Sequence, residues 1–172
     1  GIVEDAVNTF KKTGNQNLIL LHCLSSYPAD EKEMNLKVIQ TLKNIYNIPV
    51  GLSDHYPGLE MSVLALGMGA NIIERHFTLS KLYEGPDHIL SSEPQEMKKL
   101  SEISKNFVKI IGDGQKKIQP SEYVVINSQR KCIYANRSIP KGMKIRKSYL
   151  TIKGPAGGIL PKYLNLVEGR VT

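Results

Sequence analysis

Hydrophobic positions in this chain form two kinds of pattern that alternate along the sequence. Three short apolar runs have the composition of β-strands: residues 18–23, 48–52 and 71–73. Four longer stretches have an apolar face at helical spacing: residues 3–12, 33–46, 59–70 and 92–112. Strands that alternate with helices in this way predict parallel neighbours joined by right-handed crossovers, within an α/β sheet that is open or closed into a barrel.

The predicted helix at 92–112 carries its own start and stop signals. Ser92 is the expected N-cap, with Gln95 in the capping-box position and Pro94 in the first turn. Gly112 is the expected stop, because glycine is favoured just after a helix ends.

Polar residues follow two of the predicted strands at the point where each strand ends. They are Ser53, Asp54 and His55 after the run at 48–52, and Glu74 and His76 after the run at 71–73. If the strands are parallel neighbours, His55 and His76 lie on one rim of one sheet, close enough to share a metal ion. Two imidazoles that leave the coordination shell open suit a catalytic divalent ion. A lone histidine at a strand end more often only forms a hydrogen bond, but its repetition at two strand ends favours a functional site.

The composition is that of an ordinary folded protein. The chain has 172 residues, of which 41% are hydrophobic, and no uncharged run is long enough to cross a membrane. Cys23 and Cys132 lie far apart, in the contexts of a buried strand and of a second module, which does not make a disulfide framework. We therefore expect a soluble protein of the reducing cytoplasm.

The net charge of +7 raises the question of a nucleic-acid partner. The lysines, however, are scattered along helix faces and loops, without tryptophan and without aromatic residues interleaved among basic ones. We therefore expect no nucleic-acid partner and interpret the charge as a solvated surface that also suits anionic small substrates.

The chain divides into three parts by composition. Residues 1–112 contain the strand and helix pattern, residues 113–129 form a polar linker, and residues 130–172 form a small module of short β-rich pieces separated by glycine and proline. A full (β/α)8 barrel takes ~250 residues, so the first part can supply only a portion of one. The chain begins at Gly1 with no signal peptide, and we expect its front to be missing.

Four motifs resemble successive motifs of the sialic acid synthase family, which includes N-acetylneuraminate synthases and their legionaminic and pseudaminic relatives. They are LHCLSSYP at 21–28, GLSDH at 51–55, IERHFT at 73–78 and GPDH at 85–88. Residues 130–172 resemble the start of the family's antifreeze-like SAF domain, a β-clip fold, at Arg137-Ser-Ile139 and Gly158-Ile159. The resemblance implies the C-terminal portion of a (β/α)8 TIM barrel followed by a truncated SAF domain.

The resemblance also implies an activity and a set of site residues. Members of this family condense phosphoenolpyruvate with an N-acetylated hexosamine, typically N-acetylmannosamine, and release phosphate. The resemblance implies that His55 and His76 bind a divalent ion, Mn²⁺ or Mg²⁺, that polarises the sugar aldehyde. It further implies that Ser53 contacts the phosphate of phosphoenolpyruvate, that Tyr27 lies near the sugar, and that Asp87 hydrogen-bonds sugar hydroxyls and belongs with the two histidines to the catalytic set.

Three departures from the family pattern bear on these expectations. Ser25 occupies a substrate-binding position that can be asparagine in the family, which leaves the choice of sugar open. Gly154 stands where bacterial members often have an arginine that reaches the partner's sugar pocket in a domain-swapped homodimer. The family's phosphoenolpyruvate-binding lysines precede Gly1, so we expect the parent protein to be an active, dimeric synthase and these residues alone to be inactive.

Other interpretations of the same residues stay open. The chain could come from a legionaminic or pseudaminic acid synthase, or from another metal-dependent barrel enzyme that uses a different acceptor. It could also be a non-catalytic carbohydrate-binding remnant. Asp54 and Glu74 could each orient a metal-bound imidazole or form a salt bridge. His22 is expected to be a hydrogen-bonded core residue, His88 a polar lining residue, and Lys81 and Lys153 solvated.

Overall fold

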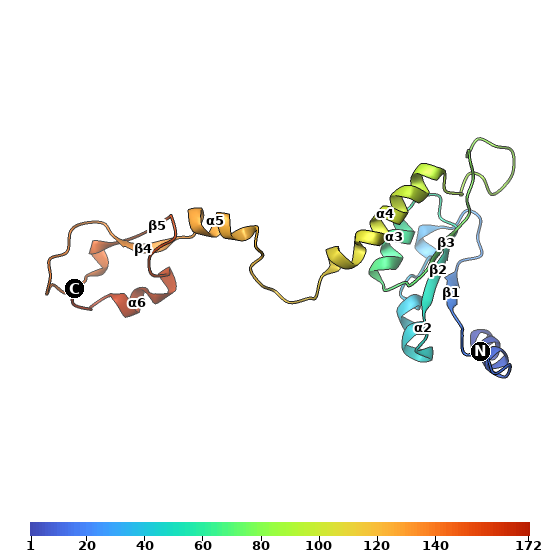
Figure 1. Ribbon diagram of the computed structural model, residues 1–172, viewed down its shortest axis with the longest axis horizontal. Helices are drawn as coiled ribbons and strands as arrows, with labels where there is room; N and C mark the ends of the chain where they lie inside the picture. The colour runs from blue at the N-terminus through green and yellow to red at the C-terminus, as the bar shows by residue number, and fades with distance from the viewer. The chain divides into compact units, whose positions relative to one another are not determined.

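The computed structural model describes residues 1–172 and divides into two compact units, Gly1–Asp113 and Gly114–Thr172 (Figure 1). The first unit contains α1 (Ile2–Lys11), β1 (Leu20–Cys23), the 3₁₀ helix η1 (Glu31–Glu33), α2 (Val38–Tyr46), β2 (Val50–Asp54), α3 (Glu60–Gly67), β3 (Ile73–Arg75) and α4 (Pro94–Ile111). The second contains α5 (Glu122–Gln129), β4 (Cys132–Ala135), η2 (Lys147–Tyr149), β5 (Leu150–Lys153), η3 (Pro161–Tyr163) and α6 (Leu164–Val167).

The first unit is built on a three-stranded parallel sheet in the order β1-β2-β3. Leu21 pairs with Gly51, and Asp54 pairs with Arg75. An isolated parallel bridge between Phe77 and Ser92 continues the pattern beyond β3. The predicted α/β class and the parallel arrangement of the three strands are therefore confirmed.

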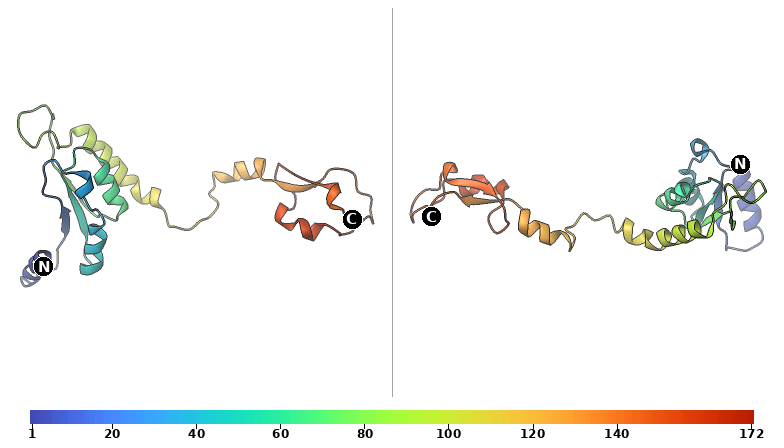
Figure 2. Two further views of the ribbon diagram at one scale, coloured as in Figure 1. Left: turned by 180° about the vertical axis from the view of Figure 1, so that it is seen from behind. Right: turned by 90° about the horizontal axis from the view of Figure 1, so that it is seen from above.

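The core of this unit lies between the sheet and helices α2 and α3, which pack on the same side of β2 (Figures 1 and 2). Ile39, Val50, Leu52 and Ala65 are fully buried there. The close packing of β2 also explains Gly51, because a Cβ at this position would lie 2.3 Å from the carbonyl oxygen of Ile72. The central strand is therefore held tightly on both sides, and its carboxyl end has a fixed position.

Strand boundaries differ from the predicted ones at the end that carries the polar residues. β2 extends through Asp54, and β3 covers Ile73–Arg75 rather than 71–73. Ser53 and Asp54 therefore lie inside β2, where every residue is buried. Only His55 and His76 directly follow their strands. Cys23, expected in a buried strand, is exposed at the end of β1.

Two helix starts were predicted wrongly. The helix expected at 33–46 begins only at Val38, because Asn35 adopts a positive φ of 39° that interrupts regular helix. For α4 the N-cap is Glu93 with Glu96 as its reciprocal partner, instead of Ser92 with Gln95. The Ser92 hydroxyl accepts a hydrogen bond from Arg75 and is not used to cap the helix.

The second unit contains an antiparallel pair, β4 with β5, in which Ile133 pairs with Ile152. Cys132 and Ile133 are its buried apolar residues. Outside β4 and β5, the short β-rich pieces expected in 130–172 consist of isolated bridges, Ile133 to Ile159 and Lys144 to Val171. Helix α5 occupies the second half of the stretch expected to be a linker. Nowhere in the chain does a helix combine the length and the apolar character that crossing a membrane demands.

Candidate functional site

His55 and His76 meet at the carboxyl ends of β2 and β3. Their rings lie edge to face, with the ring centroids 5.2 Å apart. His55 is buried, while the side chain of His76 is 32% exposed. The expected proximity of the two histidines is confirmed, and it follows from the parallel pairing of the strands that precede them. Their role as metal ligands stays a prediction.

The main chain fixes the protonation pattern of the His55 ring. Its Nδ1 atom lies 2.9 Å from the carbonyl oxygen of Leu24. Because a carbonyl oxygen can only accept, Nδ1 carries the proton, and the lone pair of the neutral ring is on Nε2. The Cys23 sulfur lies 3.9 Å from the same Nδ1 atom. Both polar contacts of the His55 ring are therefore made at Nδ1, which leaves Nε2 available.

Asp87 approaches the second histidine from the loop that follows β3. Its Oδ2 atom lies 3.6 Å from Nδ1 of His76. The loop is held at this point by Ser91, which donates from its hydroxyl at 2.7 Å and from its main-chain nitrogen at 3.1 Å to the Asp87 carbonyl. A carboxylate beside Nδ1 favours a proton on that atom and leaves Nε2 of His76 free as well.

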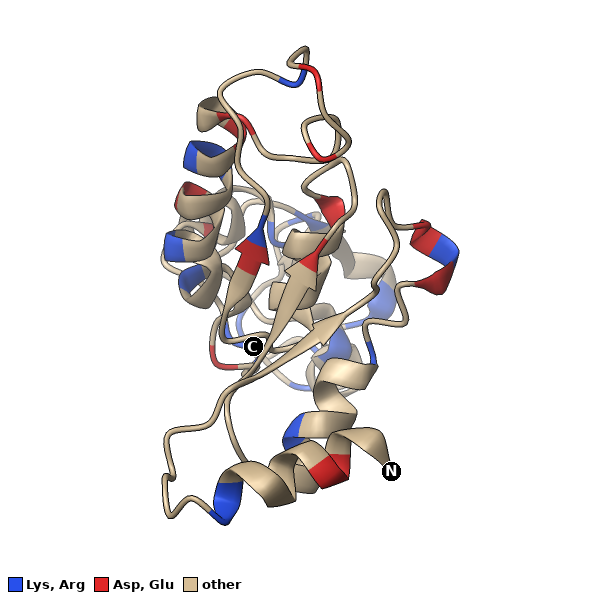
Figure 3. Cartoon of the chain, turned by 90° about the vertical axis from the view of Figure 1, so that its right-hand side faces the viewer, with Lys and Arg blue, Asp and Glu red and all other residues tan.

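Tyr27 completes the group. Its ring lies 4.2 Å from the His55 ring and 5.9 Å from the His76 ring, measured between centroids. Acidic and basic positions lie together at the strand ends and in the loop above them (Figure 3). Four of the predicted site residues, Tyr27, His55, His76 and Asp87, are therefore brought together.

The two predicted serines have other partners. Ser53 is buried and donates its hydroxyl to Glu74 Oε1 at 2.7 Å. The Ser25 hydroxyl lies 3.8 Å from the Cys23 sulfur. Neither hydroxyl forms a hydrogen bond with the two histidines. Glu74, one of the residues with two open interpretations, therefore orients Ser53 rather than an imidazole.

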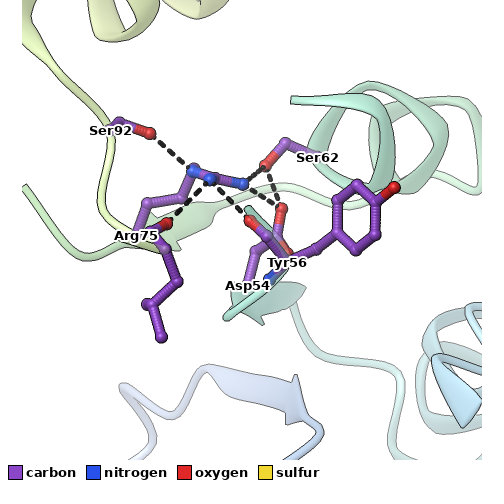
Figure 4. Close-up of polar contacts among 6 residues, drawn as sticks. Asp54, Tyr56, Ser62, Arg75 and Ser92 are labelled. Atoms are coloured by element: carbon purple, nitrogen blue, oxygen red, sulfur yellow. Dashed lines mark hydrogen bonds and ion pairs between the residues drawn. The ribbon is translucent and has the colours of Figure 1, made fainter. Parts of the chain in front are cut away.

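Asp54 forms a buried salt bridge with Arg75 (Figure 4). Of the two interpretations left open for Asp54, the structure therefore shows the salt bridge. Arg75 donates hydrogen bonds to Asp54 Oδ2 at 2.5 Å, Ser62 Oγ at 3.3 Å, Ser92 Oγ at 2.7 Å and the carbonyl oxygens of Tyr56 at 2.8 Å and Leu90 at 3.5 Å. Sequence reasoning did not single out Arg75. The available signal was a pair of opposite charges, each directly before a histidine.

The remaining candidates have structural contacts. His22 Nε2 lies 2.7 Å from the Met34 carbonyl oxygen, which confirms the expected hydrogen bond, but the residue is only partly buried and not in the core. His88 pairs with Thr78 through Nδ1 and Oγ1 at 2.8 Å. Lys81 was expected to be solvated, but it forms an ion pair with Glu96 at 2.8 Å, which ties the 78–91 loop to the start of α4.

No group of three or more His, Cys, Asp or Glu side chains is arranged to hold a metal ion. His55 and His76 are the two side chains at this rim that could hold one. Such a donor set fits a divalent ion whose remaining positions are filled by oxygen ligands from substrate or water.

The sequence model of the NeuB family matches residues 1–116. The chain belongs to the NeuB family. This confirms the resemblance to sialic acid synthases drawn from the motifs at the strand ends. The matched residues contain every member of the candidate site, so the NeuB match and the histidine pair concern the same unit.

Named relatives of this NeuB chain are synthases of nonulosonic acids. The N,N'-diacetyllegionaminic acid synthase of Campylobacter jejuni is 45% identical over 161 residues, covering 92% of this chain and 48% of the relative. The N-acetylneuraminate-9-phosphate synthase of Drosophila melanogaster is 35% identical over 191 residues, covering 96% of this chain and 51% of the relative. The chain thus spans about half the length of the curated relatives it matches.

A solved sialic acid synthetase has a similar fold. The crystal structure of N-acetylneuraminic acid (sialic acid) synthetase from Leptospira borgpetersenii, in complex with citrate, matches with a TM-score of 0.63 and 45% identity. The match covers 72% of this chain and 43% of that structure. The first unit therefore has the α/β arrangement of the sialic acid synthases.

Proposed function

We propose that the protein containing this chain condenses phosphoenolpyruvate with an N-acetylated hexosamine, such as N-acetylmannosamine, and releases phosphate. The observation that carries the proposal is the His55–His76 pair, 5.2 Å apart between ring centroids, at adjacent parallel strand ends of a NeuB chain. Its relatives named for N-acetylneuraminate 9-phosphate and N,N'-diacetyllegionaminic acid support the reaction class. The acceptor is therefore proposed as a class rather than as one sugar.

Mn²⁺ or Mg²⁺ is the proposed cofactor, held by Nε2 of His55 and Nε2 of His76. When bound, such an ion supplies Lewis-acid polarisation of the sugar aldehyde. The Leu24 carbonyl and the Asp87 carboxylate support this role, because each lies beside the Nδ1 atom of one ring.

The other site residues have proposed roles in binding the two substrates. The Tyr27 ring, packed beside both imidazoles, forms an apolar wall for the sugar and excludes water from one side. Asp87 is 55% exposed, so its carboxylate can also accept hydrogen bonds from sugar hydroxyls. Ser53 contacts the phosphate of phosphoenolpyruvate, and Ser25 contributes to the choice of sugar.

We also propose that the activity needs more than these 172 residues. The chain covers about half of each synthase relative, so residues that bind phosphoenolpyruvate can lie in the other half. Residues 130–172 are proposed as the start of an SAF domain that covers the partner subunit's site in a homodimer. Gly154 then removes one contact to the partner's sugar.

The test is phosphate release by the full-length protein, supplied with phosphoenolpyruvate, Mn²⁺ and a panel of N-acetylated hexosamines. We expect release with at least one sugar, and its loss in the His55→Ala/His76→Ala variant. His22→Gln is the matched control, because it removes an imidazole whose partner is the Met34 carbonyl, outside the pair. Sugar binding without release for every acceptor would contradict the synthase and favour a non-catalytic carbohydrate-binding protein.

A further inference from the structure

Asp54 and Arg75 occupy equivalent places on neighbouring strands. They are direct register partners, and each is followed at once by one histidine of the site. Successive residues of a strand point to opposite faces. Arg75 and Asp54 accordingly meet Ser62 of α3 on the helix-covered face, while His55 and His76 contact Tyr27. The ion pair and the histidine pair thus lie on opposite faces of the sheet at the same strand ends.

The backbone ladder stops just before the histidines. The paired positions of β2 and β3 run from Leu52 with Ile73 to Asp54 with Arg75, and His55 and His76 lie one position beyond. Neighbouring strands lie about 4.8 Å apart within a ladder. The ring centroids lie 5.2 Å apart, and side-chain contacts add to the ladder at this end.

Arg75 supplies those contacts. We use the name Arg75 cluster for Arg75 together with its side-chain partners Asp54, Ser62 and Ser92 (Figure 4). The guanidinium also binds the Tyr56 carbonyl at 2.8 Å, directly after His55. Ser92, in turn, donates its main-chain nitrogen to the His76 carbonyl at 2.8 Å. The cluster therefore binds the main chain directly after His55 and, through Ser92, at His76 itself.

Burial makes this arrangement specific. The side chains of Arg75 and Asp54 are 1% and 0% exposed, so neither charge can be compensated by water. A planar guanidinium reaches several acceptors in a fixed geometry, which a lysine ammonium does not reproduce. We infer that the Arg75 cluster is a positioning device that holds the imidazoles of His55 and His76 at the spacing needed to bind one divalent ion. This inference rests on the proposed function.

The test counts the imidazoles that bind a single metal ion, and it does not depend on turnover. One equivalent of Cu²⁺ is added to the full-length protein, and the imidazole nitrogens bound to it are counted by pulsed electron paramagnetic resonance. We expect two imidazoles in the parent protein and one in Arg75→Lys, with Mn²⁺ affinity reduced about 10- to 100-fold. Ser92→Ala, which removes one hydrogen bond but leaves the ion pair, is expected to fold and to give a smaller loss.

Three controls separate the outcomes. His55→Ala/His76→Ala gives the background from the other histidines, and Ile39→Ala, in the core away from the cluster, reports the effect of lower stability alone. Two bound imidazoles with parental Mn²⁺ affinity in both Arg75→Lys and Ser92→Ala would overturn the inference while leaving the proposed function intact. Failure of the proposed function is a different result, namely no phosphate release by the parent, and the Cu²⁺ count is read independently of it.

Discussion

The Asp87 carboxylate lies 3.6 Å from Nδ1 of His76, although eleven positions separate the two residues in the chain. This distance is longer than that of a hydrogen bond. The family resemblance implies that Asp87 contacts sugar hydroxyls, and we propose from the geometry a second task, namely orienting His76. The two tasks make different predictions for the same substitution.

Asp87→Asn is expected to weaken Mn²⁺ binding about 10- to 100-fold, because carboxylates beside metal-binding imidazoles raise their basicity and fix their orientation. Titration calorimetry with Mn²⁺ in the absence of sugar measures this. Glu84→Gln is the matched control, since it removes an exposed carboxylate from the same loop. A variant that binds Mn²⁺ like the parent but has a raised KM for the sugar would leave Asp87 with the sugar contact alone.

Ser53→Ala tests whether the Ser53 hydroxyl meets the phosphate of phosphoenolpyruvate. The hydroxyl donates to Glu74 in the structure, and Glu74 is exposed to water, so we expect a loss of only about 1 kcal/mol in the free energy of unfolding. The KM for phosphoenolpyruvate should rise while the KM for the sugar stays constant. Steady-state phosphate release by the full-length protein gives both values, and an unchanged KM for phosphoenolpyruvate would remove Ser53 from the phosphate site.

Ile39→Ala tests the packing of α2 on the sheet. Ile39 is fully buried among Val50, Leu52 and Ala65, so its truncation should lower the free energy of unfolding by about 2–5 kcal/mol. Ile45 lies on the same helix but is 64% exposed, so Ile45→Ala should change the free energy of unfolding by less than about 0.5 kcal/mol. Urea unfolding of both variants makes the comparison, and equal losses would contradict the assigned core.

Apolar patterning predicted the parallel strands because a buried strand needs a continuous apolar run, and β2 is buried throughout. It failed where a single residue adopts a special conformation or partner. Asn35 takes a positive φ that delays α2, and nothing in the 3.6-residue period reveals this. Ser92 has the composition of an N-cap, yet its hydroxyl is claimed by Arg75, a contact made across the fold.

One part of the candidate site could likewise be predicted from the sequence, and another part could not. The meeting of His55 and His76 could be predicted, because parallel strands bring their carboxyl ends to one rim of the sheet. The approach of Asp87 to His76 depends on the path of a loop, and the salt bridge of Asp54 depends on register. Both are set by three-dimensional contacts that sequence spacing alone does not specify.

Stability against acid should depend on Glu96. Burial tends to raise the pKa of its carboxyl, but hydrogen bonds from Lys81 and from the Glu93 main chain, with the charges of Lys81 and Arg75, hold this pKa below its usual range. Because the folded pKa is lower than the unfolded one, the group stabilises the protein at pH values above the unfolded pKa, and this contribution is lost as the pH falls through the folded pKa. Glu96→Gln keeps the helix cap. It should therefore lower Tm at pH 7 by a few degrees, roughly 1–5 °C, with the difference from the parent vanishing in more acidic buffer. A difference in Tm that stays constant from neutral to acidic pH would contradict this role.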